Sequence, residues 1–212
     1  MDTVKRHRKQ LWIIGIDEVG RGPLAGPITV AAVAAPVSSN FQFSISNEFS
    51  ITQFPIFKTI KDSKKLSPNQ RNVWNKTIRQ NFLYSIQSIS SGIIDRKGIT
   101  YAARVAVSDC IKKILPKLKI VNCKLKILLD GNLYAPPEYK NQRTIIRGDK
   151  TEPLIAAASI VAKVHRDRYM ARLHKKYPHY GFDRNKGYGT AYHMESIAKY
   201  GLSPVHRQSF CR

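Results

Sequence analysis

The chain has 212 residues, a length typical of one domain. Hydrophobic residues make up 42% of it, which excludes a disordered chain. Its 36 Lys and Arg residues against 14 Asp and Glu residues give a net charge of +22, which favours a nucleic acid over a membrane as partner. The three cysteines lack CxxC spacing, which excludes a disulfide scaffold and argues against a zinc site. We expect all three to be small buried apolar groups: Cys110, Cys123 and Cys211.

Nothing in the sequence predicts a membrane or export segment. No apolar run reaches the roughly 18 residues that a membrane span needs. Residues 1–10 form a basic arm, and the apolar run 11–16 after it is too short for the core of a signal peptide. We therefore expect a cytoplasmic protein, acting as a monomer, with no membrane partner.

The first third of the chain begins with two predicted strands. Apolar, β-branched runs predict strands over 11–19 and 27–36, joined by a tight Gly- and Pro-rich connection. Residues 37–59 alternate Phe and Ile with polar residues, which favours an extra strand pair, and an exposed apolar flap is the alternative. Ser67, followed by Pro and by Gln three positions on, predicts the start of a helix that runs to about residue 80.

Strands and helices alternate in the middle of the chain. Alternating apolar residues predict a strand over 82–90, and a helix over 99–115 follows a glycine and ends at a proline. Strands are predicted over 124–129 and 143–146. A long apolar helix is predicted over 154–176, opened by a Glu-Pro pair.

A Gly-rich loop over 180–189 and a last helix over 190–200 complete the chain. Strands come first and helices dominate the second half. This order predicts an α/β fold, with one mixed sheet flanked by helices and a helical C-terminal region. The whole chain, 1–212, is expected to form one domain.

Four acidic residues stand where a carboxylate serves folding poorly: Asp17, Glu18, Asp130 and Asp149. Each follows or ends a predicted strand. Asp17 and Glu18 are adjacent and would point to opposite faces, so they can share a centre only if the strand end is frayed. Clustered carboxylates repel one another unless divalent cations neutralise them, and one or two Mg²⁺ ions would suit such a set. Two ions can clamp both oxygens of an in-line phosphoryl displacement. Helix capping or surface ion pairs are the alternative for the same residues.

Gly20, Arg21 and Gly22 follow the first two acids almost immediately. Glycine lets a ligand approach the backbone amides closely, and arginine offers a planar fork for phosphate. A GxG triplet alone is typical of a tight turn. The combination DEVGRG, with acids beside the loop, indicates a phosphate-binding and metal-binding site more specifically.

These residues carry a resemblance to a known family. The stretch 16–27 (IDEVGRGPLAGP) is similar to the opening signature of type 2 ribonuclease H, ribonuclease HII. Further segments resemble the family's motifs in the same order along nearly the whole chain: 62–67 (DSKKLS), 129–131 (LDG), 147–149 (RGD), 158–168 (ASIVAKVHRDR), 174–190 (HKKYPHYGFDRNKGYGT) and 206–210 (HRQSF). The pattern resembles bacterial members without a C-terminal helical extension, and residues 37–61 are longer than is usual, as a possible insertion.

The resemblance implies a ribonuclease H-like fold and a nuclease dependent on Mn²⁺ or Mg²⁺. It implies cleavage of RNA in RNA–DNA hybrids, and a cut 5′ of a single ribonucleotide embedded in duplex DNA that leaves a 3′-hydroxyl and a 5′-phosphate. Asp17, Glu18, Asp130 and Asp149 match its metal-binding carboxylates. Asp167 is a rival for the fourth position, although Lys163, four residues before it, favours a structural ion pair there.

The resemblance also implies a substrate surface in which 178–212 takes part. Gly20, Arg21 and Gly22 match the loop that recognises the ribose 2′-hydroxyl. Tyr188 matches a tyrosine that stacks on the deoxyribose at the RNA–DNA junction, and a packing tyrosine is the alternative. Lysines that match phosphate contacts, with solvated surface charge as the alternative, are Lys64, Lys65, Lys163 and Lys186. His193 and His206 are expected to be structural rather than catalytic bases.

Two other functions remain open. A type 3 ribonuclease H shares the acidic site, but its loop usually lacks the arginine at position 21, and it carries an N-terminal substrate-binding domain for which residues 1–10 leave no room. A basic, non-catalytic nucleic-acid-binding protein fits the charge. The clustered acids oppose it, because they repel phosphate unless metal neutralises them.

Overall fold

The computed structural model describes residues 11–37, 66–118 and 124–211. Several predictions lie outside the described residues and stay predictions. These are the basic arm 1–10, the strand pair or flap at 38–61, the lysines Lys64 and Lys65, and the burial of Cys123.

A mixed five-stranded sheet forms the centre of the fold, in the order β3-β2-β1-β4-β5. β1 pairs antiparallel with β2 and parallel with β4, so the sheet changes direction at its central strand. The predicted strands are confirmed to within one or two residues. Their bounds are β1 Leu11–Val19, β2 Ile28–Val37, β3 Leu83–Ile89, β4 Lys124–Asp130 and β5 Gln142–Ile145.

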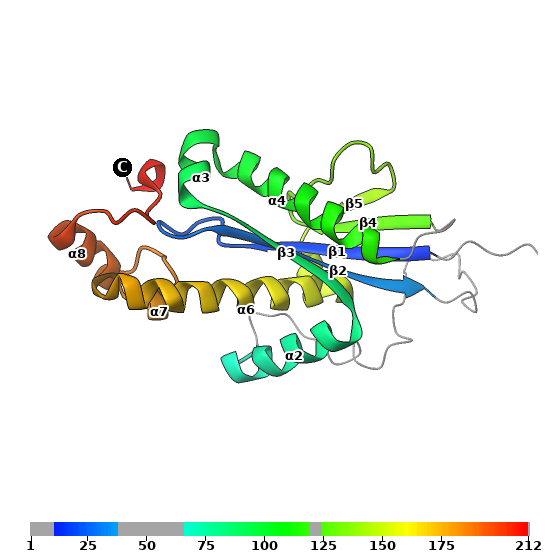
Figure 1. Ribbon diagram of the computed structural model, residues 1–212, viewed down its shortest axis with the longest axis horizontal. Helices are drawn as coiled ribbons and strands as arrows, with labels where there is room; N and C mark the ends of the chain where they lie inside the picture. The colour runs from blue at the N-terminus through cyan, green and yellow to red at the C-terminus, as the bar shows by residue number, and fades with distance from the viewer. Residues whose placement is uncertain (1–10, 38–65, 119–123, 212) are drawn as a thin grey trace, which may run out of the picture.

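Helices cover both faces of this sheet, so the predicted α/β architecture is confirmed. α4 lies over one face, and α6 lies over the other, with α2 packed outside α6 (Figure 1). α7, α8 and the C-terminal segment gather at the C-terminal end of α6, where the connection between β1 and β2 also lies (Figure 1). The helices are α2 Pro68–Asn81, α3 Ser91–Lys97, α4 Ile99–Ile114, α5 Gly148–Thr151, α6 Pro153–Lys176, α7 Phe182–Asn185 and α8 Ala191–Tyr200, with 3₁₀ turns at Leu115–Leu118, Pro178–Tyr180 and Gln208–Phe210.

Alternation along β1 divides the core into two layers. Ile14 and Ile16 join the apolar cluster under α4, whereas Ile13 joins the cluster under α6. Successive side chains of a strand point to opposite faces, so a strand covered on both faces must be apolar at every position. Asp17 and Glu18 therefore interrupt a run that is otherwise fully apolar, at the end of the central strand.

Four local features differ from the sequence-based expectations. Cys211 is only partly buried, whereas Cys110 is buried as expected. Ser91–Lys97 forms a helix, α3, that we did not predict from the sequence. Gly98 follows α3 and separates it from α4. Asp149 lies within the short helix α5 rather than directly after a strand. The predicted loop 180–189 contains the helical turn α7. By contrast, the predicted N-terminus of α2 is confirmed, because Ser67 and Gln70 form a reciprocal capping box.

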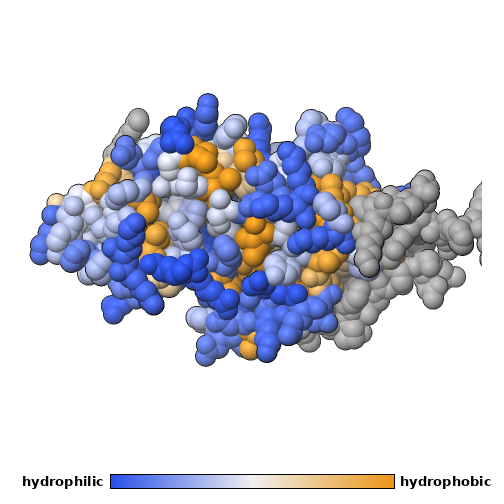
Figure 2. Space-filling view, in the orientation of Figure 1, coloured by the Kyte–Doolittle hydropathy of each residue, from blue (hydrophilic) through white to orange (hydrophobic). Residues whose placement is uncertain are grey.

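The face of the molecule in Figure 2 is largely hydrophilic. Figure 2 shows blue, hydrophilic side chains over most of one face, with separate orange patches between them. Among the described helices, none combines the length and the apolarity that crossing a bilayer requires.

Candidate active site

Three carboxylates meet at the end of the central strands. β1 and β4 are adjacent and parallel, so their carboxyl ends lie at the same edge of the sheet. Asp17, Glu18 and Asp130 each bring one oxygen to this edge, and these oxygens lie within 4.8 Å of one another. Three of the four acids that the sequence singled out thus come together.

Glu18 reaches this group without any fraying of β1, so the expected frayed strand end is wrong. β1 stays paired in register with β2 as far as Val19. Its ladder with β4, however, ends where Ile16 pairs with Leu129. The side chain of Glu18 starts on the opposite face of the sheet from Asp17. Because the pairing of β1 with β4 stops before Glu18, this long side chain can reach Asp130 around the end of the ladder.

Asp17 is buried, with 5% of its surface exposed. Burial raises its pKa well above the ordinary value, and the nearby charges of Glu18 and Asp130 raise it further. The Ser159 side chain on α6 and the Glu18 N–H, which donates to Asp17 Oδ1 at 2.7 Å, oppose this rise in pKa. Sequence reasoning missed Ser159, and its only signal was a polar residue inside an apolar helical run.

Glu18 has one satisfied and one unsatisfied oxygen. Arg21 Nη1 donates to its Oε1 at 3.1 Å. Burial raises the Glu18 pKa, and the Arg21 charge opposes that rise. Its Oε2 is buried and accepts no hydrogen bond from the described part of the chain. A buried carboxylate oxygen without a donor, beside two further carboxylates, fits a divalent cation, which supplies the missing positive partner.

Asp149 lies next to Asp130 but outside the group formed by Asp17, Glu18 and Asp130. It is buried on α5, and its N–H donates to Asp130 Oδ1 at 3.3 Å. The described carboxylates that share the 4.8 Å group do not include Asp149. Its rival, Asp167, accepts from Lys163 Nζ at 2.9 Å, which is the ion pair expected four residues apart on a helix.

The buried arginine Arg207 holds residues 20–22, called the glycine loop below, in place. Gly20 has a φ of +89°, a left-handed conformation that favours glycine. Arg207 is fully buried, and its guanidinium donates to the carbonyls of Gly20 at 2.6 Å, Arg21 at 2.9 Å and Gly26 at 3.0 Å. With these carbonyls held inward, the loop has a fixed backbone next to Glu18.

A second buried arginine, Arg166 on α6, joins this loop to the Gly-rich segment near the C-terminus. It donates to Pro27 O at 2.9 Å, Ala25 O at 3.2 Å and Lys186 O at 2.9 Å. Sequence reasoning assigned no role to Arg166 or Arg207. Both lie within the motifs quoted above, but only the folded structure shows that these charges are buried.

Tyr188 lies close to the connection between β1 and β2, which begins with the glycine loop. The Leu24 N–H donates to Gly187 O at 2.8 Å, so the residues around 24 and 187 run side by side. Tyr188 is 46% exposed, which leaves its ring available to a ligand. Lys186 adopts a left-handed conformation and its ammonium donates to Asp183 O, while Lys163 is engaged by Asp167.

The chain is similar to known proteins over nearly its whole length. A family model described as ribonuclease HII matches residues 14–212. The ribonuclease HII of Chlamydia pneumoniae is 41% identical over 200 residues, which cover 93% of this chain and 82% of that protein.

Solved structures share the fold. The structure of the PCNA–ribonuclease HII complex from Archaeoglobus fulgidus matches with a TM-score of 0.64 at 27% identity, over 92% of this chain and 93% of that one. Bst-RNase HIII in complex with Mn²⁺ matches with a TM-score of 0.70 at 19% identity, over 96% of this chain and 68% of that one. At 19% identity the second likeness concerns the fold alone.

Proposed function

The chain belongs to the ribonuclease HII family, and from this premise we propose that it cuts the RNA strand of RNA–DNA hybrids and cuts duplex DNA 5′ of a single embedded ribonucleotide, leaving a 3′-hydroxyl and a 5′-phosphate. As a member of the family it is a hydrolytic nuclease, a metal-dependent endoribonuclease H. The observation that carries the finer proposal is the cluster of Asp17, Glu18 and Asp130 directly beside the glycine loop.

Four carboxylates are proposed to hold the metal. Asp17 and Asp130 face the site from adjacent strands, and Glu18 offers its unsatisfied Oε2. Asp149, anchored to Asp130 through its backbone N–H, completes the set. Two divalent ions held by these residues would lower the pKa of the attacking water and would stabilise negative charge on the leaving oxygen. Ser159 holds the Asp17 side chain through a hydrogen bond.

The glycine loop is proposed to select the ribose. Its backbone, held by Arg207 through the carbonyls of Gly20 and Arg21, leaves the amides around Gly22 to meet the 2′-hydroxyl, which distinguishes RNA from DNA. Arg21 has 38% of its side chain exposed, so it can also reach a phosphate. Tyr188 is proposed to stack on the deoxyribose that follows the ribonucleotide.

Four lysines are proposed as phosphate contacts: Lys64, Lys65, Lys163 and Lys186. Lys163 would have to share its charge between Asp167 and a phosphate.

A cytoplasmic location, a monomeric state and a single domain spanning 1–212 stay predictions from the sequence.

A test uses an end-labelled DNA duplex with one ribonucleotide, incubated in Mg²⁺, Mn²⁺ or EDTA. We expect a single metal-dependent cut 5′ of the ribonucleotide, and no cut by Asp17→Ala. The rates in the two metals report which ion supports the reaction better. Cutting only within long hybrids would remove the proposed roles of the glycine loop and Tyr188. Binding without any product, and without regard to metal, would favour the non-catalytic nucleic-acid-binding protein.

Matched substitutions distinguish the carboxylates that are proposed to bind metal from Asp167, which forms an ion pair with Lys163. Asp130→Asn should abolish cutting and leave binding nearly intact, since it removes a ligand charge and keeps the shape. Asp149→Asn should behave likewise, whereas Asp167→Asn should keep its activity, because it loses only an ion pair on α6. Inactivity of Asp167→Asn with an active Asp149→Asn would reverse the assignment of the fourth carboxylate.

A further inference from the structure

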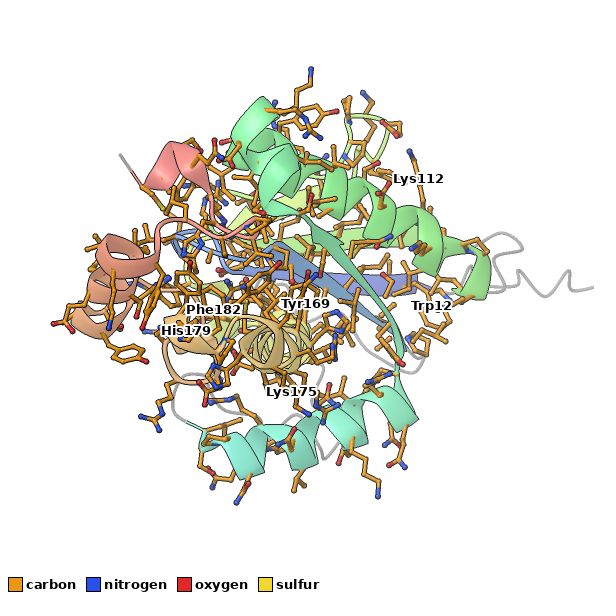
Figure 3. All side chains as sticks on the ribbon, turned by 60° about the vertical axis from the view of Figure 1, so that its left-hand side comes forward. Trp12, Lys112, Tyr169, Lys175, His179 and Phe182 are labelled. Atoms are coloured by element: carbon orange, nitrogen blue, oxygen red, sulfur yellow. The ribbon has the colours of Figure 1, made fainter. Side chains whose placement is uncertain are left out.

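Two buried histidines contact each other next to residues 186–190, the loop between α7 and α8 that carries Tyr188 and is called the Tyr188 loop below. His193 on α8 and His206 near the C-terminus place their Nε2 atoms 3.0 Å apart. His206 is 3% exposed and His193 is fully buried. Tyr180 and Phe182 pack against both rings. Figure 3 shows Phe182 in this interior, beside the C-terminal helices.

The hydrogen bonds around the two rings agree on one protonation pattern. The Ser203 N–H donates to His206 Nδ1 at 2.9 Å, so this nitrogen carries no proton. A neutral His206 then carries its proton on Nε2 and donates it to His193 Nε2. A neutral His193 in turn carries its proton on Nδ1, which lies 2.9 Å from Tyr188 O and donates to it.

Adding a second N–H proton to either ring would break this pattern. A charged His193 would set two N–H groups against each other at 3.0 Å, and a charged His206 would set its Nδ1–H against the Ser203 N–H. Burial, together with the charge of His193, lowers the pKa of His206 to about 4. Burial lowers the pKa of His193 as well. Both rings are therefore neutral at neutral pH.

The chain of bonds connects the two halves of the proposed substrate surface. His206 forms a β-bridge with Ala25, which follows the glycine loop. Its neighbour Arg207 holds the loop carbonyls. At the other end, His193 holds the carbonyl of Tyr188, whose ring is the proposed contact at the junction.

We propose that His193 and His206 are positioning residues, which set the Tyr188 loop relative to the glycine loop through this neutral hydrogen-bond chain. The inference rests on the proposed function, because it assigns to Tyr188 a contact at the RNA–DNA junction. Its consequence is selective: cleavage at a single ribonucleotide depends on the chain of bonds more than cleavage within a long hybrid does.

A matched pair of substitutions isolates the bond to Tyr188. His193→Asn and His193→Leu both remove the ring and have nearly the same shape, but only Asn keeps a donor near the position of Nδ1. We expect His193→Leu to lower kcat/KM on the single-ribonucleotide duplex about tenfold more than on a long hybrid, which is the effect of one buried hydrogen bond. His193→Asn should recover most of that selectivity. Equal losses on both substrates, or equal behaviour of Asn and Leu, would overturn the proposal.

A second measurement is independent of activity. Nitrogen-15 NMR of the histidine rings in the wild-type protein at neutral pH should report His206 protonated on Nε2 and His193 protonated on Nδ1. Any other tautomer, or a charged ring, would contradict the chain of bonds. If the wild type fails to cut the single-ribonucleotide duplex while the NMR pattern holds, the proposed function fails and the role in junction cleavage fails with it. The bond network would then remain as a structural fact.

Discussion

At the scale of single residues, Asp17 shows how function costs stability. Its carboxylate is buried beside two others, which raises its pKa. A pKa that is higher in the folded than in the unfolded chain means that ionising the group destabilises the fold, increasingly as the pH rises. The same ionised group is the one that we propose as a ligand of a divalent cation. A bound metal ion would therefore offset the destabilisation that the buried carboxylate causes.

Asp17→Asn tests this opposition. In EDTA the variant should melt at a higher temperature than the wild type, because it keeps an acceptor for Ser159 and loses the buried charge. The difference should be larger at about pH 8 than at about pH 5, since the raised pKa of Asp17 makes its ionisation destabilise the wild type increasingly as the pH rises, whereas the substituted amide does not ionise. Adding Mn²⁺ or Mg²⁺ should raise the melting temperature of the wild type and hardly that of the variant.

Asp167→Asn, as the control, should respond to metal as the wild type does. A metal response that survives Asp17→Asn would show that Asp17 is not a ligand.

At the scale of elements, the contact between β1 and α6 decides where the acids lie. A Cβ added to Gly15 would lie 2.5 Å from Leu154 O and 2.6 Å from Ile155 N, so the strand and the helix touch backbone to backbone. This close approach sets α6, which carries Ser159, directly against the strand that carries Asp17. The sequence shows Gly15 only as one glycine in an apolar strand, with no indication of its partner.

Gly15→Ala should destabilise the protein by about 3 kcal/mol or more, because neither backbone can yield without opening the core. Gly22→Ala is the matched control for stability, since its added Cβ would meet nothing within 4 Å. Thermal or urea unfolding measures both. Equal stabilities of the two variants would show that β1 and α6 can separate without cost.

At the scale of the whole molecule, the net charge of +22 acts on affinity rather than on chemistry. Phosphate contacts by Lys and Arg release counterions, so affinity for a duplex falls steeply with salt. The clustered acids Asp17, Glu18 and Asp130 occupy a small area at one sheet edge, whereas hydrophilic side chains cover most of the visible face (Figure 2). Electrostatic binding and cleavage can therefore be measured separately.

Binding of the inactive Asp130→Asn variant to duplex DNA should give a log–log slope against salt steeper than about −3. A duplex with one ribonucleotide should give a parallel line at higher affinity, because the ribose contacts carry no charge. Titration by fluorescence anisotropy provides both lines. A flat salt dependence would exclude binding through the basic surface, and coincident lines would exclude recognition of the ribose by this variant.

The strands, the main helices, the capping of α2 and the three acids that meet at the site could be predicted from the sequence, because they follow from local periodicity, from helix-end chemistry and from contiguous motifs. The sequence did not determine how Glu18 joins Asp17, since alternation along a strand places them on opposite faces. Only the early end of the β1–β4 ladder brings them together. Burial of Arg166 and Arg207, and the histidine chain to Tyr188, likewise arise from contacts between segments far apart in sequence. Such contacts depend on how the elements pack, which no local pattern of residues encodes.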